Sequence, residues 1–502
     1  MSELLPYHPA QPARVREALM VVCVLVAAIL NFVVGRDQPA LPFWDENYYI
    51  TNAERYVGGI AQISSHPPLG LMLIAAGEAW LAPNAGLDLS AVARVKNIPG
   101  DQLPAGISFE GFRLLPSLFA ACGALVFYGW LRCLALKPVV ALGFSSLYLF
   151  ENALMVHLSA VHLEAFFLTA CMGALWTLCS LVARSDSNAL LKITLFGLFA
   201  GLASMVKLPG VLLWAPALWV LLTLRLSSEE RAARLLHRCA LVGTAGATFT
   251  VTILLVFWAH SSLISKPPDL QTEAGRQDWA AMSARHQDLA LGQTRASLAD
   301  VLAVSKDHLT VMLKEQSAVP KAGPKDSKPW LWPLHHRPQN YRWDSNGVTT
   351  RYVQLVGNLV NWSIGLVALV ISLGLVVGQR VRTAKGALAG PPDRTLELLV
   401  VTYLAYMAAH LWIGTQRVMY LHHYLLPLLL TYAMAGRLWV AWTSRPSASA
   451  RKQNLGLLGI VIASVAACLF YYPLTRHLPL TVQECDMRNG LFHVVDCVGK
   501  RS

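Results

Sequence analysis

Apolar stretches of about 20 residues recur along nearly the whole chain, and this is the length that a helix needs to cross the hydrocarbon core of a membrane. Backbone polar groups find no partners in lipid, so each stretch is expected to be helical. We therefore predict an all-α polytopic membrane protein. About eleven transmembrane helices are expected, at residues 17–35, 113–133, 138–155, 158–183, 189–206, 208–225, 239–259, 353–378, 396–413, 418–437 and 455–473.

Three long polar segments interrupt this pattern, whereas lysine and arginine gather in the short loops. If the N-terminus is cytoplasmic, all the short basic loops fall on one side, as the positive-inside rule requires. An odd number of spans then places the three long segments on the opposite, outer face. The predicted divisions are a cytoplasmic N-terminus 1–16, a transmembrane core 17–259 with the outer loop 36–112, a large outer loop 260–352, transmembrane helices 353–473 and an outer tail 474–502.

The composition agrees with a membrane protein. The 502 residues are 55% hydrophobic and only 14% charged, with a mean hydropathy of +0.46, which is too apolar for an ordinary soluble enzyme. The net charge of +12 does not indicate nucleic acid, because topology accounts for the basic loops. Most cysteines lie within predicted spans, without metal-ligand spacing. Cys485 and Cys497 can pair if the tail is in an oxidising compartment, which the sequence leaves open.

An acidic pair, Asp45-Glu46, follows the first predicted span, where the chain leaves the membrane beside aromatic residues. By itself the pair is equally well explained as the start of a helix, with Asp45 as the cap and Glu46 favoured by the helix dipole. About twenty residues later comes the rigid turn Ser65-His66-Pro67-Pro68-Leu69-Gly70, and such a run alone is usually a loop breaker. Residues 68–81 are apolar but too short to span, so we expect a helix lying in the membrane interface.

Together, these two motifs at this spacing resemble the opening signature of the protein O-mannosyltransferase family, whose fold is the membrane-embedded GT-C type. Further matches follow in the family's order: Phe112-Arg113-Leu114-Leu115-Pro116-Ser117, Glu151-Asn152, Glu164, Lys207-Leu208-Pro209-Gly210, Trp330-Leu331-Trp332-Pro333, Arg337-Pro338, Tyr341, Gly357-Asn358-Leu359-Val360-Asn361-Trp362 and Tyr420-Leu421-His422-His423-Tyr424-Leu425-Leu426-Pro427. The resemblance covers roughly residues 40–430. It implies a GT-C glycosyltransferase whose outer-face loops carry the active site.

The chain also departs from the family. Leu71 and Glu164 stand where members commonly have Lys and Asp, and the outer loop 260–352 is too short for the soluble sugar-binding-like module of the eukaryotic enzymes. We therefore interpret the chain as a bacterial relative without that module, in the inner (plasma) membrane, with its active site on the periplasmic face. The departures weaken the inference about the identity of the acceptor more than the inference about the donor.

The resemblance implies a polyprenyl-phosphate-mannose protein O-mannosyltransferase, which transfers mannose from a lipid carrier to Ser or Thr hydroxyls. The predicted topology supports a lipid-linked donor independently, because outer loops have no ready access to cytoplasmic nucleotide sugars. An alternative within the same class transfers the sugar to a lipid or a cell-wall glycan. A transporter or flippase is less well supported, since these place ionisable residues at mid-span, whereas most candidates here stand at outer span ends.

Asp45 is the predicted general base, because transfer to a hydroxyl needs a proton acceptor, and Glu46 is expected to support it or to hold the acceptor. One carboxylate acting directly implies a single displacement with inversion at the anomeric carbon. The leaving phosphate needs positive charge, for which the candidates are Arg113, Lys207, Arg351 and Arg417, the last two equally well explained as interface anchors. The substrate-binding candidates are His66, Glu164, Tyr420, His422, His423 and Tyr424, although structural roles explain at least two of the four from Tyr420 onward equally well.

No cofactor follows from the sequence. A metal site made of His66, His335 and His336 lacks a clear carboxylate partner, so a divalent cation is unsupported. The expected partners are the polyprenyl-phosphate-sugar donor, a secreted protein acceptor and membrane lipid, with no nucleic acid. The identity of the sugar, the acceptor class, the length of the carrier and the oligomeric state stay open.

Overall fold

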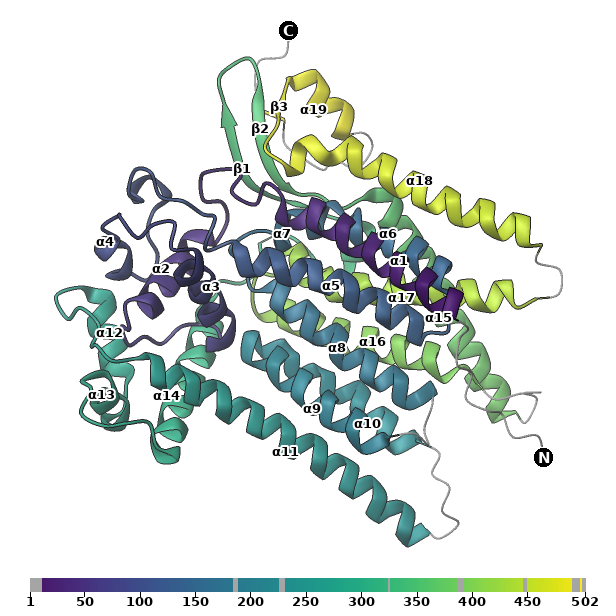
Figure 1. Ribbon diagram of the computed structural model, residues 1–502, viewed down its shortest axis with the longest axis horizontal. Helices are drawn as coiled ribbons and strands as arrows, with labels where there is room; N and C mark the ends of the chain where they lie inside the picture. Colours follow the sequence, from purple (N-terminus) through teal and green to yellow (C-terminus); the bar gives the residue numbers. More distant parts are fainter. Residues whose placement is uncertain are drawn as a thin grey trace.

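Long helices that run side by side form the body of the computed structural model, which describes residues 11–183, 188–224, 231–323, 326–385, 392–445, 449–489 and 497–498 (Figure 1). Parts of the predicted segments 1–16 and 474–502 therefore lie outside the described residues. The helices of the body are α1 (Gln11–Ala28), α5 (Leu114–Cys133), α6 (Pro138–Leu149), α7 (Asn152–Leu158), α8 (Glu164–Ala183), α9 (Ala189–Val206), α10 (Trp214–Thr223), α11 (Arg231–Leu263), α15 (Leu359–Ala384), α16 (Arg394–Gln416), α17 (Leu425–Thr443) and α18 (Ala450–Thr475).

Every predicted span has a helical counterpart, but not all of them are long enough to cross a membrane. Within the described residues, nine helices are long and apolar enough, and a tenth span is obtained if α6 and α7, which are bent by 64° at their break, are taken as one. The predicted span 208–225 is the exception. Its counterpart, Leu208–Thr223, has too few residues to count as a span, and its first turns, which contain Pro209 and Gly210, form a 3₁₀ segment, Leu208–Leu213.

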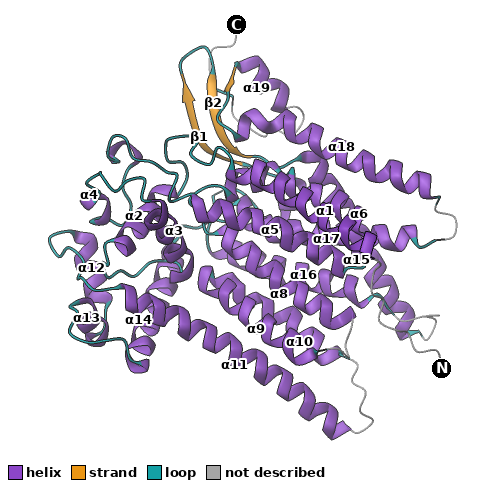
Figure 2. Ribbon diagram, viewed as in Figure 1, coloured by secondary structure: helices purple, strands orange, loops and turns teal. Residues whose placement is uncertain are grey.

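Two of the long polar segments fold into helices at one end of the bundle, which we call the loop end (Figure 2). These helices are α2 (Glu46–Val57), α3 (Pro68–Leu81) and α4 (Ser90–Ala93) from the first segment, and α12 (Glu273–Ala281), α13 (Ala284–Ala290) and α14 (Leu298–Ala318) from the second. A buried ion pair of 2.7 Å between Arg55 Nη1 and Asp278 Oδ2 joins the two segments. The expected helix at 68–81 is present as α3; its position relative to a membrane stays a prediction.

A small antiparallel sheet departs from the all-helical expectation. Its strands are β1 (Gln339–Ser345), β2 (Thr350–Leu355) and β3 (Pro479–Leu480), in the order β1-β2-β3, so the C-terminal tail pairs with the second long segment. Beside this sheet, Cys485 and Cys497 form a disulfide, the pairing that the sequence left open. The strands are short and their pairing is long-range, so no local hydrophobic period marks them.

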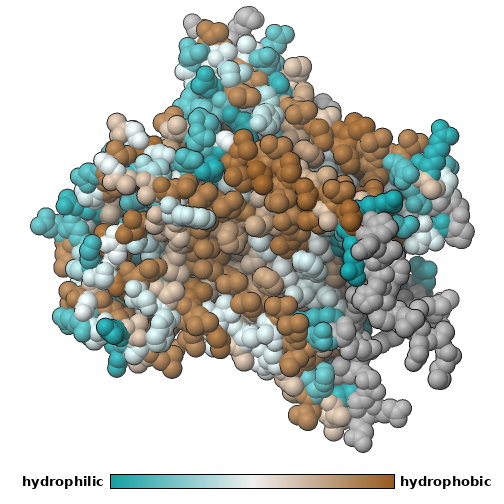
Figure 3. Space-filling model, in the orientation of Figure 1, coloured by the Kyte–Doolittle hydropathy of each residue, from teal (hydrophilic) through white to brown (hydrophobic). Residues whose placement is uncertain are grey.

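The surface of the bundle carries a broad apolar band, with hydrophilic residues gathered over the loop end and the sheet (Figure 3). Large apolar side chains on the outside of the bundle, such as Leu255 on α11, Val370 on α15 and Leu469 on α18, are more than half exposed. A soluble protein rarely exposes so large an apolar patch. The band is the surface expected of helices that face lipid.

Candidate active site

Asp45 is the N-cap residue of α2, but its carboxylate does not cap the helix. Part of the side chain is exposed to solvent, and it makes no hydrogen bond to any residue in the part of the chain that the structure describes. The preceding residue, Trp44, has a φ of 52°, a left-handed conformation that costs a bulky residue about 1–3 kcal/mol. Its ring packs against Tyr341 and Tyr420, with ring centroids 4.9 and 5.1 Å apart. Aromatic packing thus holds a strained turn that presents a free carboxylate.

Glu46, by contrast, is buried and fully engaged. Its two oxygens accept hydrogen bonds of 2.8 and 2.7 Å from Nε and Nη2 of Arg113, and also from the backbone N–H groups of Val161 and Phe43. The remaining N–H groups of Arg113 donate to backbone carbonyls of residues 36, 39 and 41. This pair fastens the turn that carries Asp45 to the start of α5.

The expected roles of Glu46 and Arg113 are therefore corrected. Glu46 has no free oxygen with which to hold an acceptor, and it supports Asp45 only by fixing the backbone. All five guanidinium N–H groups of Arg113 are already used, so none is left for a phosphate. Both side chains are almost completely inaccessible to solvent, at 0% and 1% exposure.

A charged network lies close to Asp45. Glu164, at the start of α8, contacts Nζ of Lys207 through one oxygen, and its other oxygen lies 3.0 Å from Nε2 of His157. The opposite nitrogen of His157, Nδ1, is 2.8 Å from the hydroxyl of Tyr341. Glu164 and His157 are buried, while Lys207 is partly exposed. Glu164 thus anchors the lysine and leaves its ammonium group at the edge of a cavity.

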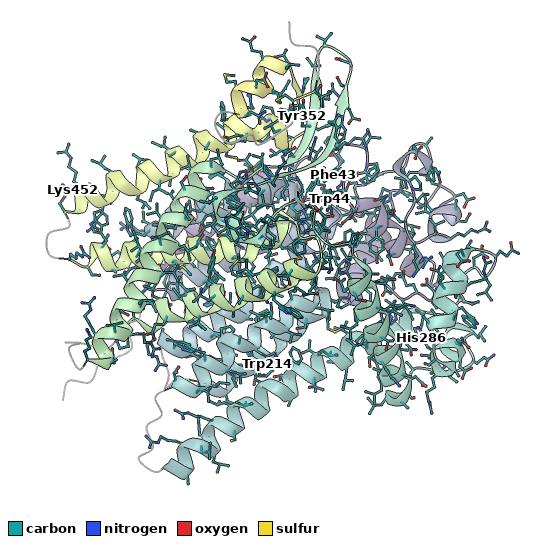
Figure 4. All side chains as sticks on the ribbon, turned by 180° about the vertical axis from the view of Figure 1, so that it is seen from behind. Phe43, Trp44, Trp214, His286, Tyr352 and Lys452 are labelled. Atoms are coloured by element: carbon teal, nitrogen blue, oxygen red, sulfur yellow. A yellow bond between two sulfur atoms is a disulfide. The ribbon has the colours of Figure 1, made fainter. Side chains whose placement is uncertain are left out.

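Aromatic and imidazole rings surround this network. The ring of His157 stacks on His422 and lies beside His162, at centroid distances of 4.8 and 4.3 Å. Phe43 lies between His162 and Tyr341, and Trp44 meets the edge of His422. The labelled Phe43 and Trp44 lie beside each other where the loop end meets the bundle (Figure 4). Flat, polar-edged surfaces of this kind can pack against a sugar ring and bond its hydroxyls.

A cavity of about 610 Å³ adjoins the network. It contains two basic groups, Lys207 and Arg417, and three imidazoles, His66, His410 and His423. Arg417 is held by the side-chain oxygen of Gln316, a residue of α14 that also lines the cavity. The rest of the wall is mostly apolar and includes Leu208, Pro209, Val211, Leu212, Leu313, Trp412, Ile413 and Met419. Such a cavity suits a ligand with an anionic head and a hydrocarbon chain.

Burial shifts the pKa values of two candidate residues in this region. Although Asp45 is partly exposed, the surrounding protein desolvates its carboxylate and raises its pKa, and the positive charge of Lys207 opposes this rise. Burial also lowers the pKa of His66 to about 3, helped by Lys207. His66 is therefore neutral at physiological pH, and its Nε2 lies 3.4 Å from the hydroxyl of Tyr49. It can exchange hydrogen bonds with a ligand but adds no charge.

Most of the predicted residues gather around this one region, namely Asp45, His66, Glu164, Lys207, Arg417, Tyr420, His422 and His423. Two do not. Arg351 is exposed on β2, where it pairs in register with Asp344 and Pro479 and does not line the cavity. Tyr424 is 2% exposed, bonds the hydroxyl of Tyr403 and packs on Trp362. Neither assignment agrees with this geometry: Arg351 stands outside the cavity, and the contacts of Tyr424 give it a structural role.

Sequence reasoning missed several residues of the site: His157, His162, Gln316 and His410, together with Trp44 and Tyr341, which it noted only within motifs. His162 stands two residues before Glu164, a spacing that could have drawn attention to it. His157 lies in an apolar stretch, where a lone histidine is read as part of the core. Nitrogens or oxygens of His157, Glu164 and His422 also lie within 4.8 Å of one another, a geometry that could hold a metal ion. The contact of Lys207 with Glu164 competes with that use.

Comparison with protein families gives two matches. The model for dolichyl-phosphate-mannose-protein mannosyltransferase matches residues 22–260, and the model for the C-terminal four-transmembrane region of protein-O-mannosyltransferase matches residues 306–492. The two matched regions do not overlap, and together they include Asp45, Lys207 and Arg417.

A solved structure shows a similar fold. A chain of the S. cerevisiae protein O-mannosyltransferase Pmt1-Pmt2 complex, bound to the sugar donor, superposes with a TM-score of 0.74 at 15% sequence identity, over 98% of this chain and 95% of the yeast chain. The Archaeoglobus fulgidus oligosaccharyltransferase AglB, in complex with an inhibitory peptide and a dolichol-phosphate, reaches only 0.49 at 11% identity, over 94% of this chain and 57% of the archaeal one.

Proposed function

This chain belongs to the protein O-mannosyltransferase family, and we propose that it transfers mannose from a polyprenyl-phosphate carrier to Ser or Thr hydroxyls of proteins, with Asp45 as the base. One observation carries the proposal. A carboxylate without a hydrogen-bond partner among the described residues stands close to a cavity that combines two cations with apolar walls.

The donor would bind in that cavity. Its volume of about 610 Å³ lies in the range of small-molecule sites. Lys207 and Arg417 would meet the phosphate, and the apolar residues of the wall would contact the first isoprene units. Both cations are held in place by neighbours, Lys207 by Glu164 and Arg417 by Gln316. Pre-positioned charge of this kind stabilises a leaving group without reorganisation in the transition state.

The chemical step would be a single displacement. The acceptor hydroxyl oxygen attacks the anomeric carbon of mannose and forms the new C–O bond, while the bond from that carbon to the phosphate oxygen breaks. The hydroxyl proton passes to the carboxylate of Asp45, and the carrier phosphate leaves with the electron pair, its added charge met by Lys207 and Arg417. Because burial raises the pKa of Asp45, its carboxylate accepts a proton more readily than an ordinary aspartate does. Attack opposite the leaving group inverts the anomeric configuration.

A direct assay with purified protein tests this proposal. We expect mannose transfer to a Ser/Thr-rich peptide from polyprenyl-phosphate-mannose and none from GDP-mannose, with the Asp45→Asn variant as the background control. The product's anomeric configuration should be opposite to that of the donor. Activity with the nucleotide sugar alone would reject the lipid-linked donor. Transfer to a lipid or glycan, with none to peptide, would favour the alternative acceptor class.

We also propose that the loop end faces the extracytoplasmic side of a bacterial plasma membrane. The support is the charge pattern, since the basic loops stand at the opposite end of the bundle, where Lys452 lies in the first turn of α18 (Figure 4). With the free cysteines replaced, single cysteines are introduced at Gln293 in the loop end and at Lys452; both sites are exposed. An impermeant maleimide applied to whole cells should label Gln293→Cys only. Labelling of both sites, or of Lys452→Cys alone, would contradict this orientation.

A further inference from the structure

Three histidines from separate elements meet inside the loop end, away from the candidate active site. They are His260 near the end of α11, His286 on α13 and His308 on α14. The three residues are 0%, 0% and 1% exposed. One ring nitrogen of each lies within 4.8 Å of those of the other two, and Nε2 of His260 is 3.1 Å from Nε2 of His308. Figure 4 labels His286 among the short helices of this end.

Hydrogen bonds orient two of these rings from outside the cluster. Nδ1 of His260 lies 2.8 Å from the hydroxyl of Tyr56, and Nδ1 of His286 lies 3.2 Å from Oδ2 of Asp307. The same oxygen of Asp307 accepts hydrogen bonds from the backbone and the hydroxyl of Ser283, so the carboxylate is itself fixed. Both rings are thereby turned to present Nε2 to the centre. A histidine that ligates a metal is usually held in this way, with its second nitrogen on a carboxylate or another polar group.

Hydrogen bonding within the cluster does not account for this arrangement. The contact between His260 and His308 can satisfy one N–H and one lone pair. Nε2 of His286 is buried and has no hydrogen-bond partner. An unsatisfied buried polar atom costs about 1–3 kcal/mol. A cation at the centre would engage a lone pair from each of the three rings.

The geometry points to a structural zinc site, and we propose that His260, His286 and His308 bind one Zn²⁺ ion through their ring nitrogens. Zinc binds imidazole nitrogens at about 2.0–2.1 Å in a tetrahedron, which puts ligand nitrogens about 3.3 Å apart. The 3.1 Å between His260 and His308 is close to that separation. Three histidines leave the fourth position to a water molecule. Three protein ligands with a water are common in catalytic zinc sites, but the burial of all three rings favours a structural role here.

The site would join parts of the loop end that are far apart in sequence. His260 belongs to the helix that enters the second long segment, whereas His286 and His308 belong to helices within it. Tyr56, which bonds His260, is on α2. Metal binding would therefore stabilise the second segment against α11 and against the helix that begins beside Asp45. This inference does not depend on the proposed transferase activity.

Metal analysis of the full-length protein in detergent, purified without a histidine tag, tests the site. The wild type should contain about one zinc per chain, whereas His286→Ala should contain at least tenfold less. His237→Ala, which changes an exposed histidine near the other end of α11, is the matched control and should keep its zinc. A zinc chelator should lower the Tm of the wild type and of His237→Ala, and should leave that of His286→Ala unchanged.

The proposal would be overturned by any of several results. A wild type that holds no zinc, even after incubation with micromolar zinc chloride, has no such site. Equal zinc in His286→Ala and wild type would place the metal elsewhere, and loss in His422→Ala alone would assign it to the cluster beside Lys207. If His286→Ala fails to fold, X-ray absorption spectroscopy of the wild type replaces it. A first shell of three imidazoles supports the site, and a shell with a thiolate or without imidazole contradicts it.

Discussion

Replacing Asp45 with asparagine is expected to lower turnover by about 10²–10⁴-fold, the range for loss of a positioned general base. The asparagine keeps the shape of the side chain but cannot accept a proton from the acceptor hydroxyl. Because the carboxylate of Asp45 has no hydrogen bond to lose in the described structure, the fold should be undisturbed. Initial rates with saturating polyprenyl-phosphate-mannose and peptide, together with the donor's Kd, measure the effect. The Kd should change little.

Lys207→Met is the contrasting variant for this experiment. It removes the charge that we propose meets the phosphate in both ground and transition states, so donor affinity should weaken along with turnover. The pH profile provides a second check. With Asp45 as the proposed base, turnover needs its ionised carboxylate, so turnover should fall as the pH drops through the pKa of Asp45, which desolvation raises. The acid limb should therefore lie above the range of an ordinary aspartate. Full turnover in folded Asp45→Asn protein would remove Asp45 from the mechanism.

The helical body could be predicted from sequence because lipid leaves the backbone no alternative to helix. The limits of that prediction lie where local chemistry competes with hydropathy. The stretch 208–225 is as apolar as its neighbours, yet Pro209 and Gly210 tighten its start. A Cβ at Gly210 would collide with the backbone of Ser204, so this close approach needs glycine. Composition shows that the segment is apolar, but it does not show that its first turns are 3₁₀.

The candidate site could be predicted in part, because charged residues next to span ends are conspicuous. Which charges meet one another could not be predicted. Glu46 and Arg113 stand 67 positions apart, and both were expected to contact substrate. In the structure they bond each other instead. His157 lies within an apolar stretch, where a histidine is expected to be part of the core. In the structure it links Glu164 to Tyr341. A sequence gives the type of each group, whereas its role depends on whether a partner already occupies it.

Breaking the Glu46–Arg113 pair is expected to lower the stability of the protein and to leave its catalytic activity nearly unchanged. Arg113→Met leaves the carboxylate of Glu46 buried without its counter-charge, which typically costs about 3–5 kcal/mol. Arg113→Lys should also destabilise, because an ammonium group cannot reproduce the two parallel bonds to Glu46 and the three bonds to backbone carbonyls. The Tm in detergent and the yield of folded protein measure the loss. Donor Kd and turnover of the surviving folded fraction should be close to wild type.

The double variant Glu46→Gln with Arg113→Met separates this account from a catalytic one. Neutralising Glu46 removes the unpaired buried charge, so part of the stability lost in Arg113→Met should return, giving a favourable coupling in the double-mutant cycle. A phosphate-binding arginine predicts a different pattern, with normal Tm, weakened donor affinity and no rescue by Glu46→Gln. If Arg113→Met is as stable as wild type and binds donor poorly, Arg113 has the phosphate-binding role that the sequence predicted. The bidentate pair would then be one state of a side chain that opens to receive the phosphate.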